Sequence, residues 1–195
     1  MTLLALLRHA PTDWNKARRL QGRADIPLAD VSRIELGQRR LPPAVADFRA
    51  LSSPLRRCLE TASLLSLAPA IDGRLIEMDW GAYEGHTLRD LQAKFGFDFA
   101  ANEARGLDFQ PPEGESPRDV QTRVDPLLAE IGAAGRAAIA VTHRGVIRAV
   151  YARAIGWDMT GKPPHELDLY ALHLFQLDGT GTPSVEQINI PLDRR

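Results

Sequence analysis

The sequence predicts an α/β protein with a largely parallel sheet. Short apolar runs alternate along the chain with segments of helical periodicity, which is the pattern of successive βαβ units. Two of the runs, Leu3–Leu7 and Ala137–Thr142, lead directly to Arg8-His9 and to His143. Because ligands bind outside the carboxyl ends of strands in open α/β sheets, we expect one site assembled from both ends of the chain.

The apolar runs themselves define the expected strands. The first is too short for anything but a buried strand, and it ends abruptly in an arginine and a histidine. Strands are expected at Leu3–Leu7, Phe48–Leu51, Ala137–Thr142, Ala171–Leu177 and Ser184–Ile190.

The first two helices are marked by capping residues. Ser53 followed by Pro54 predicts an N-cap with proline at the first helical position, and the helix is expected to run to about Leu67. Thr87 with Asp90 resembles a capping arrangement that opens a second helix. Gly96 is expected to end that helix.

Two further helices are expected in the second half of the chain. Ser116-Pro117 with Asp119 opens one of them, although Pro126 should kink or interrupt it. The other lies between Gly145 and Gly156, with Gly156 as its C-terminal cap.

The segment 97–115 has little periodicity and contains two glycines and two adjacent prolines. We interpret it as a surface excursion of one domain that spans residues 1–195. Long loops in compact domains often cover binding sites, so this excursion is expected to cover the substrate, although a plain insertion would have the same composition.

Composition is that of an ordinary globular chain. Its 195 residues are 44% hydrophobic and 25% charged, and the net charge of −1 gives no reason to expect nucleic acid or a membrane as partner. Only three residues are lysine, so nearly all positive charge is guanidinium, which suits bidentate recognition of phosphate. All apolar segments belong to the predicted core, and they give no prediction of oligomeric state.

The expected compartment is the cytoplasm. The single cysteine, Cys58, cannot form an internal disulfide, which fits a reducing environment. The apolar N-terminus lacks a basic leader and is shorter than the roughly 7–15 apolar residues of a secretory signal. No stretch approaches the roughly 18 apolar residues of a membrane span.

Two other segments indicate a functional site only when they are considered together with the histidines. Arg57 falls in the first turn of a predicted helix, where a cation is electrostatically misplaced unless an anion lies nearby. Glu77 is an acid in a glycine- and aromatic-rich segment, and neither residue alone would indicate a site.

Taken together, the segments resemble the histidine phosphatase superfamily, in the branch with cofactor-dependent phosphoglycerate mutases and ribazole phosphatases. The family's opening motif is similar to Arg8-His9-Ala10-Pro11-Thr12, followed by Trp14-Asn15. The other matches occur in the family's order and span most of the chain: Arg19-Leu20-Gln21-Gly22, Asp25 and Pro27-Leu28, the helix of Arg57, then Glu77, Gly81, Glu84 and Gly85, and Val141-Thr142-His143-Arg144-Gly145-Val146-Ile147-Arg148.

This resemblance implies a three-layer sandwich, with helices on both faces of a mostly parallel sheet. It also implies a metal-independent, cofactor-free phosphatase that acts on a small phosphomonoester through a phosphohistidine. His9 would be the nucleophile and Glu77 the proton donor to the leaving group. The transferring group would be bound by the side chains of Arg8, Arg57, His143 and Asn15.

The chain also departs from the family pattern at several positions. Ala10 and Pro11 replace glycine and an acid or amide, Arg144 stands where a small residue is common, and Ser32 replaces a glycine. If the backbone after His9 needs a positive φ, alanine there costs energy; otherwise its methyl group only narrows the pocket. These changes are expected to alter substrate preference rather than abolish activity.

Other interpretations remain open. Phosphoryl transfer of the phosphoglycerate mutase type needs the same groups, and a non-catalytic phosphate-binding regulator would keep the pocket. Asp79 or Glu84 could replace Glu77 as the acid. His9, His143 and Glu77 could in principle bind zinc, but Arg8 and Arg57 would repel the dication. The identity of the substrate is open among sugar phosphates, glycerate phosphates and ribazole phosphate.

Overall fold

The computed structural model describes residues 1–195 and centres on a six-stranded sheet of order β4-β3-β5-β1-β6-β7. Strand β1 lies inside the sheet, parallel to β5 on one side and antiparallel to β6 on the other. Only β6 runs against the other five strands. The strands are β1 (Thr2–Arg8), β3 (Arg49–Ser52), β4 (Ala70–Ile71), β5 (Ala138–Thr142), β6 (Leu172–Leu177) and β7 (Pro183–Ile190).

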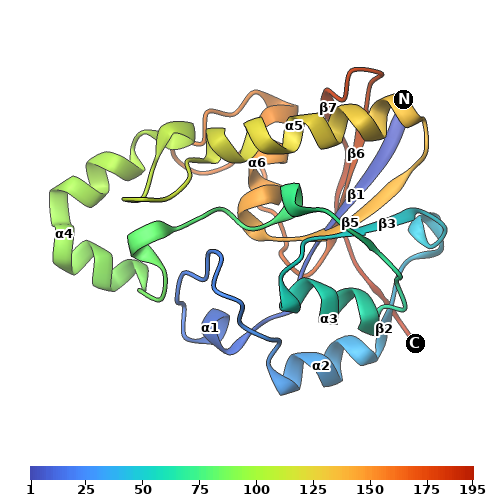
Figure 1. Cartoon of the computed structure of the whole chain (residues 1–195), viewed down its shortest axis with the longest axis horizontal. Coiled ribbons are helices and arrows are strands. Elements are labelled where there is room, and N and C mark those ends of the chain that lie inside the picture. The colour runs from blue at the N-terminus through green and yellow to red at the C-terminus, as the bar shows by residue number, and fades with distance from the viewer.

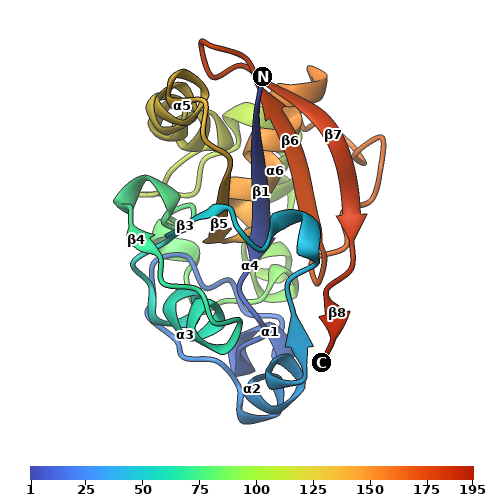
Figure 2. The same ribbon diagram turned by 90° about the vertical axis from the view of Figure 1, so that its right-hand side faces the viewer.

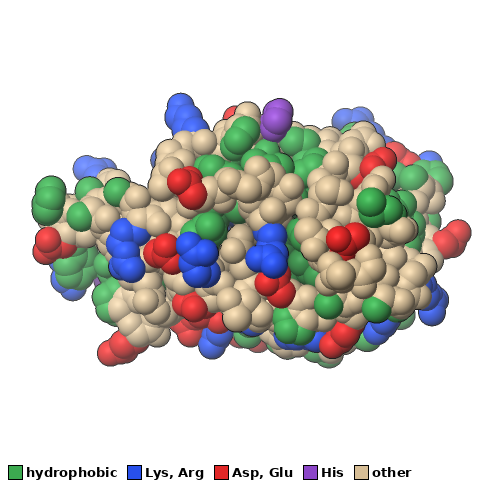
Figure 3. Space-filling view, turned by 90° about the horizontal axis from the view of Figure 1, so that it is seen from above, with side chains coloured by type: hydrophobic (Ala, Val, Ile, Leu, Met, Phe, Trp, Pro, Cys, Tyr) green, Lys and Arg blue, Asp and Glu red, His purple; other side chains and the backbone are tan.

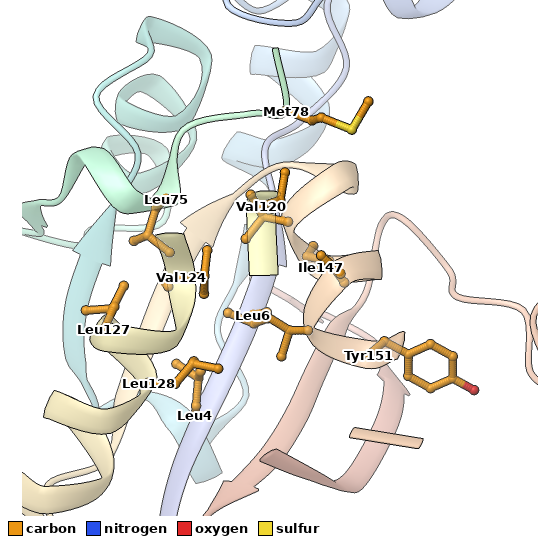
Figure 4. Close-up of a cluster of buried hydrophobic side chains, with 14 of the residues drawn as sticks. Leu4, Leu6, Leu75, Met78, Val120, Val124, Leu127, Leu128, Ile147 and Tyr151 are labelled. Atoms are coloured by element: carbon orange, nitrogen blue, oxygen red, sulfur yellow. The ribbon is translucent and has the colours of Figure 1, made fainter. Parts of the chain in front are cut away.

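Helices cover both faces of this sheet, as the resemblance implied (Figure 1). Because side chains alternate along β1, Leu4 and Leu6 enter one core while Ala5 and Leu7 enter the other. The first core packs against α5 (Pro117–Ala134) and α6 (Arg144–Ile155), and Figure 4 shows Leu4 and Leu6 facing side chains from both helices. The second core includes Leu36 of α2 (Asp30–Gly37), while Cys58 and Ala62 of α3 (Arg56–Leu64) pack on Val141 of β5.

The five predicted strands are confirmed, with ends that differ by at most one residue. The sequence prediction missed β4 and a small second sheet, in which β2 (Arg39–Arg40) pairs with β8 (Asp193–Arg194) beside the C-terminus (Figure 2). All three missed strands are two residues long, so they have no periodicity to detect.

Helix α3 begins later than predicted. Its N-cap is Leu55, without a side-chain capping bond, so the prediction that Ser53 caps the helix is wrong. The hydroxyl of Ser53 instead lies 2.7 Å from a ring nitrogen of His143. The helix also ends at Leu64, three residues before the predicted end.

Helix α4 (Leu88–Glu103) begins at the predicted cap of Thr87 and Asp90, but it does not end at Gly96. Gly96 has φ 50° and ψ −117°, so it breaks the helical path, and a second helical stretch follows it. The first part of the segment 97–115 is therefore helical, and the rest is irregular apart from η4 (Gly106–Asp108). Figure 1 shows this arm reaching away from the sheet.

The two remaining predicted helices begin or end at their predicted caps. In α5, the hydroxyl of Ser116 accepts from the backbone N–H of Asp119, and the helix continues through Pro126 without interruption. Helix α6 ends at Gly156, which has the left-handed φ of 67° that favours glycine. The short elements are α1 (Asp13–Lys16), η1 (Pro43–Val45), η2 (Gly73–Leu75) and η3 (Gly81–Tyr83). None of the helices combines the length and the apolar character that a membrane crossing requires.

Candidate active site

A cavity of about 310 Å³, here called the site cavity, opens where β1 and β5 end. The structure brings five of the six residues that the sequence singled out to its walls: Arg8, His9, Asn15, Arg57 and Glu77. The sixth, His143, is fully buried beside the cavity, and the centroid of its ring lies 5.2 Å from that of His9. Since β1 and β5 are paired, their carboxyl ends place the two histidines together.

The ring of His9 is fixed in one tautomer. Its Nδ1 lies 2.7 Å from the carbonyl oxygen of Ala10, which only accepts, so Nδ1 carries the proton. Thr61 of α3 accepts from the backbone N–H of Ala10 at 3.0 Å and thereby supports this turn. Burial, reinforced by the charges of Arg8 and Arg57, holds the pKa of His9 well below 6.5. Nε2 of His9 therefore carries a free lone pair at neutral pH.

Arg57 is fully buried, and three of its five N–H groups are bonded within the protein. Nη1 donates to the carbonyl of Ala24 at 2.7 Å, Nη2 to that of Gly22 at 2.8 Å, and Nε to Nδ1 of His143 at 3.3 Å. The loop that carries Gly22 thus fixes the plane of the guanidinium. Two N–H groups remain available to an oxyanion.

Both ring nitrogens of His143 contact other side chains. Because Arg57 donates to Nδ1, the neutral ring carries its proton on Nε2, which donates to the hydroxyl of Ser53. The pKa of His143 lies well below 6.5, chiefly through burial and also through the charge of Arg57. The thiol of Cys58 lies 3.4 Å from Nε2, and burial raises the pKa of this thiol, which makes it a poor nucleophile.

Arg8 is the last residue of β1. Its Nε is buried and has no hydrogen-bond partner in the protein. Burial also lowers the pKa of this guanidinium, with Glu77 acting in the opposite direction. A buried donor without an acceptor is costly, so its presence beside His9 indicates that a ligand supplies the acceptor.

Glu77 presents two differently placed carboxyl oxygens. Oε1 accepts from the backbone N–H groups of Met78 at 2.9 Å and Gly145 at 3.0 Å, whereas Oε2 has only a long contact of 3.4 Å to Gly145. Burial raises the pKa of Glu77 above 4.5, which favours a carboxyl group able to give up a proton. The alternative acids, Asp79 and Glu84, are not on the walls of the site cavity.

Asn15 reaches the cavity from the start of α1. Its Oδ1 accepts from the backbone N–H of Thr12 at 3.0 Å in a capping box. The carbonyl end of the side chain is thereby held against the backbone, and the amide group is left as a donor to the cavity.

The departures from the family pattern have different structural consequences. Ala10 does not have a positive φ, so its methyl group causes no backbone strain there. Pro11 lines a separate cavity on the other side of His9, together with residues of α2 and the C-terminus. Ser32 is buried within α2 rather than at its start. Arg144 is on the wall of the site cavity, at the first residue of α6.

Sequence reasoning missed several residues of the site. Ser53 and Thr61 orient the two histidines, and only the spatial arrangement reveals this because each lies far from its partner in the sequence. Arg19 and Arg148 also line the cavity, and their type and their place within the matched motifs could have indicated it.

Comparison with known proteins places the chain in a family. A sequence model of the histidine phosphatase superfamily (branch 1) matches residues 4–191. Phosphoserine phosphatase 1 of Hydrogenobacter thermophilus is 31% identical over 170 residues, with 82% of this chain and 79% of the relative covered. Glucosyl-3-phosphoglycerate phosphatase of Mycolicibacterium vanbaalenii is 35% identical over 184 residues, with 82% and 77% covered.

Other relatives agree with this placement. A 2,3-bisphosphoglycerate-dependent phosphoglycerate mutase of Azorhizobium caulinodans is 34% identical over 138 residues, with 66% of this chain and 67% of the relative covered. The solved structure of a mycobacterial glucosyl-3-phosphoglycerate phosphatase in complex with VO3 has a TM-score of 0.75 and 25% identity, covering 97% of this chain and 100% of the other. The protein therefore belongs to the histidine phosphatase superfamily, as its motifs predicted.

Proposed function

We propose that the protein hydrolyses small phosphomonoesters through a phosphohistidine formed on His9. The phosphatases among its relatives support this reaction class. One observation carries the mechanism: the bond from Nδ1 of His9 to the carbonyl of Ala10 leaves the Nε2 lone pair free beside two buried arginines. This is the arrangement that a nucleophilic imidazole needs.

In the first step, Nε2 of His9 attacks phosphorus. The nitrogen–phosphorus bond forms while the bond from phosphorus to the leaving oxygen breaks, and that oxygen takes the proton of Glu77. Arg8 and Arg57 stabilise the charge on the equatorial oxygens through their unused N–H groups, and Asn15 adds a neutral donor.

In the second step, water attacks phosphorus and gives a proton to the Glu77 carboxylate. The nitrogen–phosphorus bond breaks, which returns His9 to its neutral form and releases inorganic phosphate. His143 acts in this proposal through its contacts with Arg57 and His9, since both of its ring nitrogens are bonded to protein side chains.

The segment 97–115 is proposed to cover the substrate. Four of its residues, Phe99, Glu103, Gly106 and Phe109, line the site cavity, and the aromatic pair is buried. The leaving group would meet the two aromatic side chains. The cytoplasm is the compartment in which we propose that the reaction occurs, because the single cysteine, Cys58, has no partner for an internal disulfide and so fits a reducing environment.

The test is hydrolysis of p-nitrophenyl phosphate in the presence of EDTA, with the wild type and His9→Ala compared. We expect turnover by the wild type and an acid-labile phosphoryl label on it, with both lost in His9→Ala. Turnover that persists in His9→Ala would refute the assignment of the nucleophile. Inactivity of the wild type would instead favour a strict mutase or a phosphate-binding regulator, and conversion of 3-phosphoglycerate to 2-phosphoglycerate would then separate those two.

A mutase reaction is the second candidate, because some relatives carry that name. It shares the first step, but a substrate hydroxyl rather than water accepts the phosphoryl group. Incubation with 3-phosphoglycerate and 2,3-bisphosphoglycerate distinguishes the two: a phosphatase releases inorganic phosphate, whereas a mutase accumulates 2-phosphoglycerate.

A further inference from the structure

The site cavity holds more positive charge than one phosphoryl group requires. Its walls carry five arginines (Arg8, Arg19, Arg57, Arg144 and Arg148) and two acids (Glu77 and Glu103). This excess is local, because the net charge of the whole chain is −1. On the face of the molecule in Figure 3, acidic and basic side chains are interspersed.

Three of the five arginines are accounted for. Arg8 and Arg57 lie close enough to His9 for their charges to lower its pKa. Arg19 donates to the carbonyl of Gly85 at 2.7 Å and so ties two loops together. This leaves Arg144 and Arg148 without a role in the proposed reaction.

Arg144 and Arg148 lie four residues apart on α6, and both face the site cavity. This spacing puts them on one side of the helix, separated by about 6 Å along its axis. Neither forms an ion pair or a side-chain hydrogen bond within the protein. Arg153 on the same helix does pair with an acid, Asp125, at 3.2 Å.

Arg144 is exposed, whereas Arg148 is half-buried and held in place, and both positions carry an electrostatic cost. The Arg148 guanidinium lies 5.0 Å from the centroid of the Trp157 ring, which restricts its orientation. Burial and the nearby charge of Arg144 lower the pKa of Arg148 to about 10. Arg144 is moreover the first residue of α6, where the positive end of the helix dipole disfavours a cation. An anion between the two guanidinium groups would offset both their mutual repulsion and the unfavourable position of Arg144 at the helix N-terminus.

Helix α6 also determines on which side of the cavity the two arginines lie. Gly145, which follows Arg144, donates its N–H to Glu77, the proposed proton donor to the leaving group. The two arginines therefore lie on the leaving-group side of the cavity. The remaining acid on the walls, Glu103, pairs with neither of them.

We propose that Arg144 and Arg148 form a second anion subsite, which binds a negatively charged group on the leaving group of the substrate. This inference rests on the proposed function and narrows its substrates to phosphomonoesters that carry a second anionic group. A guanidinium pair binds carboxylate and phosphate alike, so either group fits the subsite.

Matched substrates test the subsite and distinguish its two ligands. 3-Phosphoglycerate and glycerol 3-phosphate differ by a carboxylate, and propane-1,3-diol bisphosphate and its monophosphate differ by a phosphate. We expect kcat/KM to be at least tenfold higher for the more charged member of one pair. The pair that shows this preference identifies the anionic group.

Variants of the two arginines test whether they cause the preference for the more charged substrate. Arg144→Gln and Arg148→Gln should each reduce the preference at least fivefold, mainly through KM, while Arg148→Lys should retain part of it. Arg153→Gln, which removes the same charge from the same helix outside the cavity, should leave the preference unchanged. Melting temperatures separate this effect from a purely structural role of Arg148 against Trp157, which would lower stability without changing the preference.

Equal kcat/KM values within both pairs, or a preference that survives both glutamine variants, would overturn the subsite while leaving the phosphatase intact. If the wild type hydrolysed none of the compounds, nor p-nitrophenyl phosphate, the proposed function would fail instead. Calorimetric binding of the same four compounds to the wild type and to Arg144→Gln would then test the subsite. The ratio of dissociation constants within each pair would replace the ratio of kcat/KM values.

Discussion

The backbone N–H of Gly145 donates to Oε1 of Glu77 at 3.0 Å, and a Cβ on Gly145 would lie only 2.4 Å from that oxygen. These residues are 68 positions apart in the chain, so the contact joins two sequence motifs at one atom. The close approach explains why a glycine follows Arg144: a side chain there would displace the carboxyl group from both backbone donors.

Gly145→Ala is therefore expected to impair the proton donor. The added methyl group also lies 3.2 Å from Cβ of Met78, so the carboxyl group must move to make room. We expect kcat/KM for an alkyl phosphate to fall about tenfold or more, with a smaller fall for p-nitrophenyl phosphate. Gly37→Ala is the matched control, because a Cβ at Gly37 meets no atom within 4 Å. Equal activity of the two variants would contradict this prediction.

Glu77→Gln tests the acid more directly. The amide oxygen can still accept from Met78 and Gly145, so the geometry of the site is expected to persist. The value of kcat/KM, which reports steps up to formation of the phosphoenzyme, should fall by about 10²- to 10⁴-fold for an alkyl phosphate. It should fall far less for p-nitrophenyl phosphate, whose leaving group hardly needs protonation. Equal losses for both substrates would point to another acid.

Much of this arrangement could be predicted from local sequence. The run that forms β1 is buried and continuous, and the motifs after β1 and β5 lie at the carboxyl ends of paired strands, where ligands bind. The caps at Thr87 and Ser116 were predicted because each is complete within four residues. Local signals of this kind do not depend on the rest of the fold.

The sequence predictions were wrong where contacts with other parts of the fold override the local pattern. Ser53 looks like a helix cap, but its hydroxyl is taken by His143, 90 positions away, and α3 starts without a side-chain cap. Gly96 was expected to end a helix, yet Phe99 beyond it packs into the core and supports a second helical stretch. The excess of arginine on the cavity wall became evident only when residues from several elements were brought together.

Arg57→Ala is expected to weaken the binding of vanadate, an analogue of the transferring phosphoryl group. The change removes two free N–H donors and also leaves the carbonyls of Gly22 and Ala24 without their partner. We expect the inhibition constant for vanadate to rise at least tenfold. Arg56→Ala, at an exposed neighbour that pairs with Glu60, is the control. Unchanged inhibition of Arg57→Ala would remove this residue from the site.

The stability of the protein should decline as the pH falls below about 6.5, and His143 should account for part of this decline. Burial holds the pKa values of His9 and His143 well below 6.5 in the folded protein, whereas an unfolded histidine titrates near that value. Between the folded and unfolded pKa values the unfolded state binds more protons, so the free energy of unfolding decreases as the pH decreases. Each histidine contributes at most about 1.4 kcal/mol per pH unit, and this contribution fades as the pH rises above 6.5 and the unfolded histidine loses its proton.

Urea unfolding between pH 8 and pH 5.5 measures this effect. The raised pKa of Glu77 acts in the opposite direction, because the folded state then binds more protons, but it does so in the wild type and the variants alike. We therefore expect His143→Gln to show a shallower fall in the free energy of unfolding than the wild type over this range. His86→Gln, which removes an exposed histidine, controls for the loss of a histidine as such. Parallel curves for the wild type and His143→Gln would show that the buried ring does not couple folding to pH.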